Sequence, residues 1–339
     1  MKRFWKAYWI EISFFVVGCI LIHLFLWDRN LRPRFASHLD TTKASELGQF
    51  IGGYLGTILL LASVALLIGS FRSQRATGER TAFESRFFEL LKFHRENVSE
   101  IAIGDRVGRK VFIPLIREFR ETLGIVRHCC EQLAPTYPQD RRVDLAYMVF
   151  YYGVGSNSTP VLRAAIRNDH PAQLIGCVIE SMEQTQTAYR STVSELKAVP
   201  RHNEFVTALR ERLSTLTSLP YTPFDGHQSR LGHYYRHLFH LVRYAKTNVP
   251  KGLSATDYVD LVRAQLTNHE QALLCVNALS RIGARWRSEQ YITVFDLIKN
   301  IPENFFDPLF EVNVRVLFKD VRFEYMTPGK GEEPNRDSM

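Results

Sequence analysis

A long uncharged apolar run, from Leu47 to Phe71, limits what this chain can fold into more than any other feature. An α-helix rises 1.5 Å per residue, so about 20 residues cross the ~30 Å hydrocarbon core of a bilayer. A buried helix of a soluble protein rarely contains an uncharged stretch of this length. The run therefore predicts a transmembrane helix over residues 47–71.

A second apolar run lies nearer the N-terminus, where Ile12 to Trp27 carries no formal charge and an extension back to Ala7 reaches spanning length. Basic residues before the run would also suit a cleaved signal peptide. However, the run exceeds a usual signal-peptide core, and no small-residue cleavage site follows Trp27. We predict a hairpin of two transmembrane helices within residues 1–71, with spans over about 7–27 and 47–71. Aromatic residues suited to the membrane interface bracket the first span: Trp5, Tyr8, Trp9 and Trp27.

The topology of this hairpin follows from charge and cysteine usage. The five cysteines show no C-x-x-C spacing, which suits a reducing cytosol. We predict a two-pass protein of the bacterial inner membrane, with both termini cytoplasmic and the lipid bilayer as a partner. The spacing of Gly52 and Gly56 lets helices approach closely and favours a homo-oligomer.

The rest of the chain predicts a cytoplasmic bundle of helices over residues 72–328, followed by a disordered tail over 329–339. Capping-box spacing at Thr81 and Glu84 predicts a helix start after a polar linker. Strand-like alternation is confined to 312–325, which suits an edge hairpin or a last helix. The fold class is thus mainly α. Further helices are predicted over 111–133, 144–152, 171–199, 202–216 and, best defined, 256–280.

Composition and motifs exclude several function classes. The formal net charge of +8 suits an acidic partner such as phospholipid or nucleic acid. The sequence has no Walker A, G-x-G-x-x-G, H-E-x-x-H or G-x-S-x-G motif. Nucleotide hydrolysis and zinc protease chemistry are therefore disfavoured, and we expect no cofactor and no metal.

The densest polar cluster, Gly226 to Tyr244, predicts a helix with His233, Arg236, His237 and His240 on one face. Apolar residues on its other sides indicate a helix that is buried almost all round. Three interpretations remain open. The face could be a partly buried structural surface, or it could bind a phosphate or nucleic acid. It could also bind a metal, although no acidic or cysteine ligand at helical spacing completes such a site.

A second constellation lies in the helix predicted over 256–280. Arg263 and His269 have the spacing of the R-x(4–6)-H pair in HEPN-type ribonucleases, where both side chains act on the scissile phosphate. Arg230 and His237 fit the same loose pattern. Asn277, farther along, is a candidate binding residue or a bridge to another helix.

Five blocks of the sequence resemble the phage abortive infection proteins of the AbiC-like type: 83–98, 108–112, 151–155, 231–244 and 258–280. The last two, in this order and spacing, are the specific ones. The resemblance implies a bacterial antiphage effector, sometimes encoded beside other defence components. It implies no particular catalytic mechanism.

The preferred hypothesis is a non-enzymatic effector anchored in the inner membrane, which disrupts the membrane or arrests growth when infection triggers it. One alternative is a membrane-tethered ribonuclease that uses Arg263 and His269, or the face with Arg236 and His240. Another is a binding module for a nucleotide or nucleic acid. The expected partners beyond lipid are a further copy of the chain, a defence-system protein, or phage or host nucleic acid.

Overall fold

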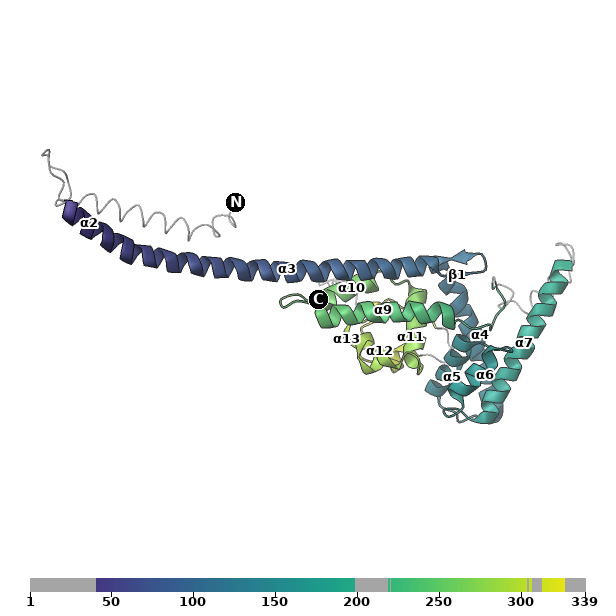
Figure 1. Ribbon diagram of the computed structural model, residues 1–339. Coiled ribbons are helices and arrows are strands. Elements are labelled where there is room, and N and C mark those ends of the chain that lie inside the picture. Colours follow the sequence, from purple (N-terminus) through teal and green to yellow (C-terminus); the bar gives the residue numbers. More distant parts are fainter. Residues whose placement is uncertain (1–40, 199–218, 220, 304, 307–312, 327–339) are drawn as a thin grey trace, which may run out of the picture. The chain divides into compact units, whose positions relative to one another are not determined.

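The computed structural model describes residues 41–198, 219, 221–303, 305–306 and 313–326, and the protein is mainly α. The chain divides into two compact units, one up to Ala76 and one from Thr77 onward. Figure 1 shows the elements. The longer helices are α2 (Thr41–Phe50), α3 (Gly56–Glu100), α4 (Phe112–Leu133), α5 (Gln139–Tyr152), α6 (Ser158–Ile166), α7 (Ala172–Ala198), α9 (Gln228–Asn248), α10 (Ala255–Arg263) and α11 (Asn268–Leu279). The shorter ones are α12 (Ala284–Ser288), α13 (Tyr291–Val294) and α14 (Val314–Leu317).

The apolar run forms a helix that is long enough to span a membrane. The helical stretch Gly48–Glu100 contains an 18-residue window of mean hydropathy 2.2, none of which is buried. Among the residues that the structure describes, it is the one helix whose length and composition would allow it to cross a membrane. The predicted two-helix hairpin is therefore not what the described residues form, and the predicted first span, 7–27, lies outside them.

The predicted helix start at Thr81 is wrong, because α3 continues from Gly56 to Glu100 without a break. Side-chain pairs one turn apart stabilise the helix near the expected linker: Arg80 Nε lies 2.9 Å from a carboxylate oxygen of Glu84. This part of α3 buries an apolar stripe: Phe83, Phe87 and Val98 are buried, and Leu90 and Leu91 pack beside them.

A short hairpin after α3 had no signal in the hydrophobic pattern. Strands β1 (Ala102–Ile103) and β2 (Arg106–Val107) pair antiparallel, with Ala102 opposite Val107. Gly104 and Gly108, both at positive φ, allow the tight turn and the entry into α4.

The core of the second unit surrounds α11. All residues from Glu270 to Leu279 are buried, and α11 contacts both α4 and α5. The predicted helices over 111–133, 144–152 and 171–199 are confirmed as α4, α5 and α7, whereas the one predicted over 202–216 lies outside the described residues.

The helix predicted over 256–280 is in fact two helices, α10 and α11. The chain leaves the helix after Arg263 and restarts at Thr267, whose hydroxyl accepts from the Glu270 N–H while the Glu270 carboxylate accepts from the Thr267 N–H. This reciprocal capping box satisfies the free N–H groups of the new helix. The region predicted as a hairpin or a last helix contains α14 and a 3₁₀ turn at Glu324–Met326, and the predicted tail lies outside the described residues.

Two glycines allow the chain to cross itself at the end of α5. Gly153 and Gly226 have φ of +78° and +87°, and each lies against the other's backbone. The His227 N–H donates to the Tyr151 carbonyl at 2.8 Å, and the Val154 N–H donates to the Phe224 carbonyl at 2.8 Å. These bonds fix the segment that leads into α9.

A buried carboxylate completes this crossing. Glu118 of α4 is fully buried; one oxygen accepts from the Phe224 N–H at 2.7 Å and the other lies 2.9 Å from His227 Nε2. Because every acceptor site has a partner nearby, the charge can be held inside the protein. The start of α9 is thereby anchored to α4 and α5.

Candidate binding pocket on helix α9

Helix α9 carries the predicted cluster on an exposed face. Its buried side consists of Leu231, Tyr234, Tyr235, Leu238, Leu241, Val242 and Ala245. His233, Arg236, His237 and His240 are exposed, so the expectation of a helix buried almost all round is wrong. The cause is the regular spacing of the apolar residues, which gives α9 one buried stripe and one polar stripe.

A pocket of about 580 Å³ lies between α9, the end of α11 and α12, with one contribution from α5. This size is within the usual range for small-molecule sites. Of the predicted residues, the pocket brings together Arg236, His240 and Asn277, while His233 and His237 do not line it. The lining residues are Tyr151, Gln228, Gly232, Tyr235, Arg236, Phe239, His240, Arg243, Asn277, Ile282, Gly283, Arg285 and Trp286.

The pocket is positively charged. Arg236, Arg243 and Arg285 line it, and no Asp or Glu does so among the described residues. The Arg236 Nε–H donates to the Gly232 carbonyl of its own helix at 3.0 Å, which leaves its terminal amino groups for other partners. Arg285 lies over the Phe239 ring at 4.6 Å and 3.5 Å from Glu289 at the rim.

Aromatic side chains also line the pocket, on the same helices as the arginines. Trp286 is 2% exposed and meets the half-buried Phe239 edge to face, with ring centroids 5.0 Å apart. Tyr151 lies against Gly232, where a Cβ would come within 2.9 Å of the Tyr151 hydroxyl. Glycine at 232 therefore lets α5 and α9 approach beside the pocket.

Asn277 lines the pocket from the end of α11 and is 1% exposed. Its amide Nδ2 donates to the Tyr147 hydroxyl at 2.9 Å, and its Oδ1 has no hydrogen-bond partner among the described residues. Gly283 is packed closely against this oxygen, since a Cβ there would come within 2.4 Å of it. Asn277 is thus both the bridge to another helix that the sequence suggested and a pocket residue.

His237 lies on another part of α9. Burial lowers its pKa, and the nearby His233, His240 and Arg236 lower it further. His237 also lies close enough to His94 of α3 to affect the titration of that buried side chain. Of the four predicted residues, Arg236 and His240 therefore line the pocket, whereas His233 and His237 lie outside it.

The buried His94 predicts a stability loss in acid. Burial lowers its pKa from 6.5 to about 4, with smaller effects from His237 and Arg109. A depressed histidine pKa means that the unfolded chain binds the proton first, so stability is present above pH 6.5 and is lost as the pH falls from 6.5 toward 4. The full difference is about 3 kcal/mol.

Denaturant unfolding of the full chain between pH 7 and 4 measures this slope. His94→Gln, which cannot titrate, is expected to flatten it, while His128→Gln at an exposed site of α4 is expected to keep it. An unchanged slope in His94→Gln would assign the acid sensitivity to other groups.

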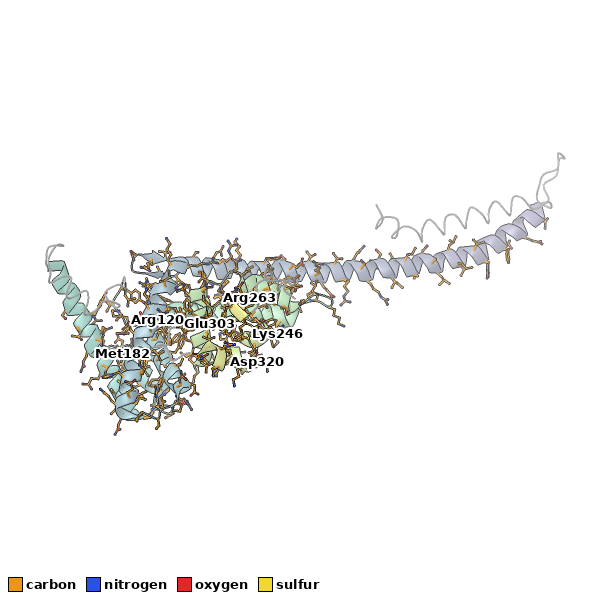
Figure 2. All side chains as sticks on the ribbon, turned by 180° about the vertical axis from the view of Figure 1, so that it is seen from behind. Arg120, Met182, Lys246, Arg263, Glu303 and Asp320 are labelled. Carbon is orange, nitrogen blue, oxygen red and sulfur yellow. The ribbon has the colours of Figure 1, made fainter. Side chains whose placement is uncertain are left out.

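The structure gives Arg263 and His269 separate partners. Arg263 donates to the Phe295 carbonyl at 3.1 Å and pairs with Asp260 at 3.0 Å, and it lines a second cavity of about 550 Å³. His269 packs edge-on against Phe305, and burial, together with the charges of Arg120 and Arg117, lowers its pKa. Figure 2 shows Arg263 and Arg120 at separate places. The catalytic role of the pair stays a prediction.

Sequence reasoning missed Arg243, Arg285 and Trp286. Arg243 follows Arg236 by seven residues, or about two helical turns, so the helical face could have been extended to include it. Arg285 and Trp286 lie on the five-residue α12, which has no periodic pattern to reveal it. Among the described residues, no group of three or more His, Cys, Asp or Glu side chains is placed to hold a metal.

Residues 226–306 match the family model described as "Putative phage abortive infection protein". This confirms the resemblance for the last two sequence blocks; the three earlier blocks lie outside the matched segment. All the residues that line the α9 pocket, apart from Tyr151, fall inside it. A search of curated proteins and a search of solved structures found no match.

Proposed function

We propose that this protein is an effector of bacterial antiphage defence that is anchored in the inner membrane and disrupts that membrane, or arrests growth, after infection. The observation that carries the proposal is an uncovered apolar helix in a chain whose residues 226–306 match a phage abortive infection family. The helix supplies the membrane anchor and the matched segment supplies the biological role.

The apolar part of α3 supports the anchor because its side chains have no cover within the structure. Burying one Leu- or Phe-sized side chain contributes about 1.5–3 kcal/mol, so leaving many in water is costly. Apolar residues occur at consecutive positions and therefore on all sides of the helix, which is typical of a lipid-embedded segment. Figure 2 shows their side chains standing out around the helix. The exposed residues are Ile58, Leu59, Leu60, Leu61, Val64, Leu66, Leu67, Ile68 and Phe71.

The proposed topology has a first span over 7–27, a second over 47–71, and both termini in the cytoplasm. Arg72, Arg75, Arg80 and Arg86 follow the second span, which agrees with the enrichment of basic residues on the cytoplasmic side. Gly52 and Gly56 leave open space beside the helix, since a Cβ at either position would meet nothing within 4 Å. That space suits close packing against a second copy of the chain.

Membrane-potential dye measurements on infected cells test the mechanism. Cells that express the full chain are expected to depolarise after infection and before phage release, and to plate the phage poorly. Cells with the empty vector are expected to keep their potential until lysis. Intact protection with unchanged polarisation and continued growth of infected cells would contradict the proposal.

A double variant separates this mechanism from RNA cleavage. Arg263→Ala with His269→Ala is expected to keep full phage protection, because the two side chains contact different partners. Efficiency of plating measures the outcome, with protein abundance checked by immunoblot. Loss of protection at normal abundance, together with loss of RNA cleavage by the purified chain, would favour the ribonuclease hypothesis instead.

A further inference from the structure

We propose that the α9 pocket binds a nucleotide, meaning a compound with both a phosphate group and a planar base, and that this ligand switches the effector. The switching role rests on the proposed function, whereas the binding does not.

The arginines of the pocket suit phosphate. Arg236 and Arg243 are separated by seven residues, which places them about 10 Å apart along α9 with His240 between them. Among the described residues no carboxylate pairs with either arginine. Arginine keeps its charge at any physiological pH and binds phosphate oxygens through two parallel N–H groups. Arg285 adds a third guanidinium from α12.

The aromatic residues of the pocket suit a base. Phe239 and Trp286 line the pocket from α9 and α12, and Tyr151 lines it from α5. The Arg285 guanidinium lies over the Phe239 ring, so a base that stacks there takes the place of this contact. Bases stack on such rings whatever their sequence identity, because every base has a π-face. A ligand with phosphate alone would leave these aromatic side chains without a contact to it.

The pocket also offers a hydrogen-bond acceptor. Asn277 is almost fully buried, its Nδ2 is engaged by Tyr147, and its Oδ1 has no partner within the described part of the chain. A buried polar atom without a partner is costly unless something else satisfies it. An exocyclic amino group of a base is a donor of the kind that an amide oxygen accepts.

Size limits the ligand to a small molecule or the end of a strand. A volume of about 580 Å³ is within the usual range for sites that bind small molecules. Two sources share this chemistry: a free nucleotide, linear or cyclic, and the 5′-phosphorylated end of an RNA. The experiment distinguishes them by its probes.

Binding is measured on the full chain, purified in detergent, by the fluorescence of Trp286. The probes are ATP, AMP, cyclic di-AMP and a 5′-phosphorylated tetra-adenylate RNA. The controls are adenosine, which has no phosphate, and inorganic phosphate, which has no base. At least one probe is expected to change the emission with saturation. Trp286→Phe is expected to remove that signal, because the other tryptophans, Trp5, Trp9 and Trp27, lie in another part of the sequence.

Arg243→Ala is expected to raise the Kd for the active probe at least about 10-fold, through loss of charge-assisted hydrogen bonds. Arg95→Ala removes the same charge from an exposed site on α3 and is expected to leave the Kd unchanged. The Kd is also expected to rise with salt. Saturation by the RNA alone assigns the strand end, and saturation by a mononucleotide or cyclic probe assigns the free compound.

Three results would overturn the inference: no probe binding at millimolar concentration, inorganic phosphate competing as well as the nucleotides, or equal Kd values for Arg243→Ala and Arg95→Ala. The phage assay then separates the two proposals. Arg243→Ala is expected to lose protection while it still sediments with membranes. A chain that protects and sediments normally but binds no nucleotide retains the proposed function and loses this inference.

Discussion

Gly226→Ala and Gly153→Ala are each expected to destabilise the folded protein by more than about 3 kcal/mol, which is the range of severe single substitutions. A Cβ at Gly226 would come within 2.3 Å of the Tyr152 carbonyl oxygen, and one at Gly153 within 2.4 Å of the Asp225 carbonyl carbon. Both neighbours are backbone, so neither can rotate away. Positive φ adds about 1–2 kcal/mol for a residue with a side chain.

Thermal unfolding of the purified full chain measures this effect, with soluble yield as a second readout. Gly252→Ala is the matched control, because Gly252 has φ of +89° and a Cβ there would meet nothing within 4 Å. It is expected to cost only the conformational part, about 1–2 kcal/mol. Equal melting temperatures for Gly226→Ala and Gly252→Ala would show that the backbone crossing does not limit stability.

In a chain shortened to residues 41–339, which lacks the proposed first span, Leu60→Lys combined with Leu67→Lys is expected to release the protein from the membrane, and in the full chain the same pair is expected to abolish phage protection. A lysine near the middle of a span, as at position 60, costs about 2.5–3.5 kcal/mol for insertion, and the lysine at position 67 adds a smaller cost because it lies nearer the end of the span. Both leucines are more than half exposed within the structure, so the changes disturb no packing of the second unit. The measurements are sedimentation with membranes after an alkaline wash, and efficiency of plating.

Gln74→Lys combined with Thr81→Lys adds the same two charges to exposed positions of α3 that follow the apolar run. This control is expected to sediment and protect as the unchanged chain does. If the shortened Leu60→Lys/Leu67→Lys chain resists the alkaline wash and the full-length variant protects fully, residues 47–71 do not anchor the protein.

Periodic apolar spacing predicted most of the long helices well, because α4, α7 and α9 each bury a regular stripe, whereas α5 is buried at every position from Val143 to Tyr151. It failed between α10 and α11, where apolar Val262 and Leu266 continue the helical pattern across residues that are not helical. The Thr267–Glu270 capping box was visible in the sequence, but it competed with an uninterrupted hydrophobic pattern. At Thr81 the cap signal itself was misleading, because Thr81 and Glu84 have capping-box spacing but lie within a continuous helix. Tertiary packing therefore decides whether a helix begins at a cap pattern.

The pocket was only partly predictable. Arg236 and His240 follow from one helical face, and Asn277 from its place near the end of α11. Arg285 and Trp286 come from a short helix whose position depends on Gly283 packing against Asn277, a contact that no local pattern encodes. The exposure of the histidines was also misjudged, because the aromatic residues between them form a single stripe rather than a covering on every side.

The position of α11 has a practical consequence for anyone who wishes to express the matched segment, residues 226–306, by itself. Helices α4 and α5, which shield α11 from water, both precede that segment, as do Glu118 and the carbonyl that receives the His227 amide hydrogen. A fragment cut at those borders loses its neighbours on two sides and is expected to aggregate. The matched segment is therefore one part of a larger folded unit, and we do not expect it to fold by itself.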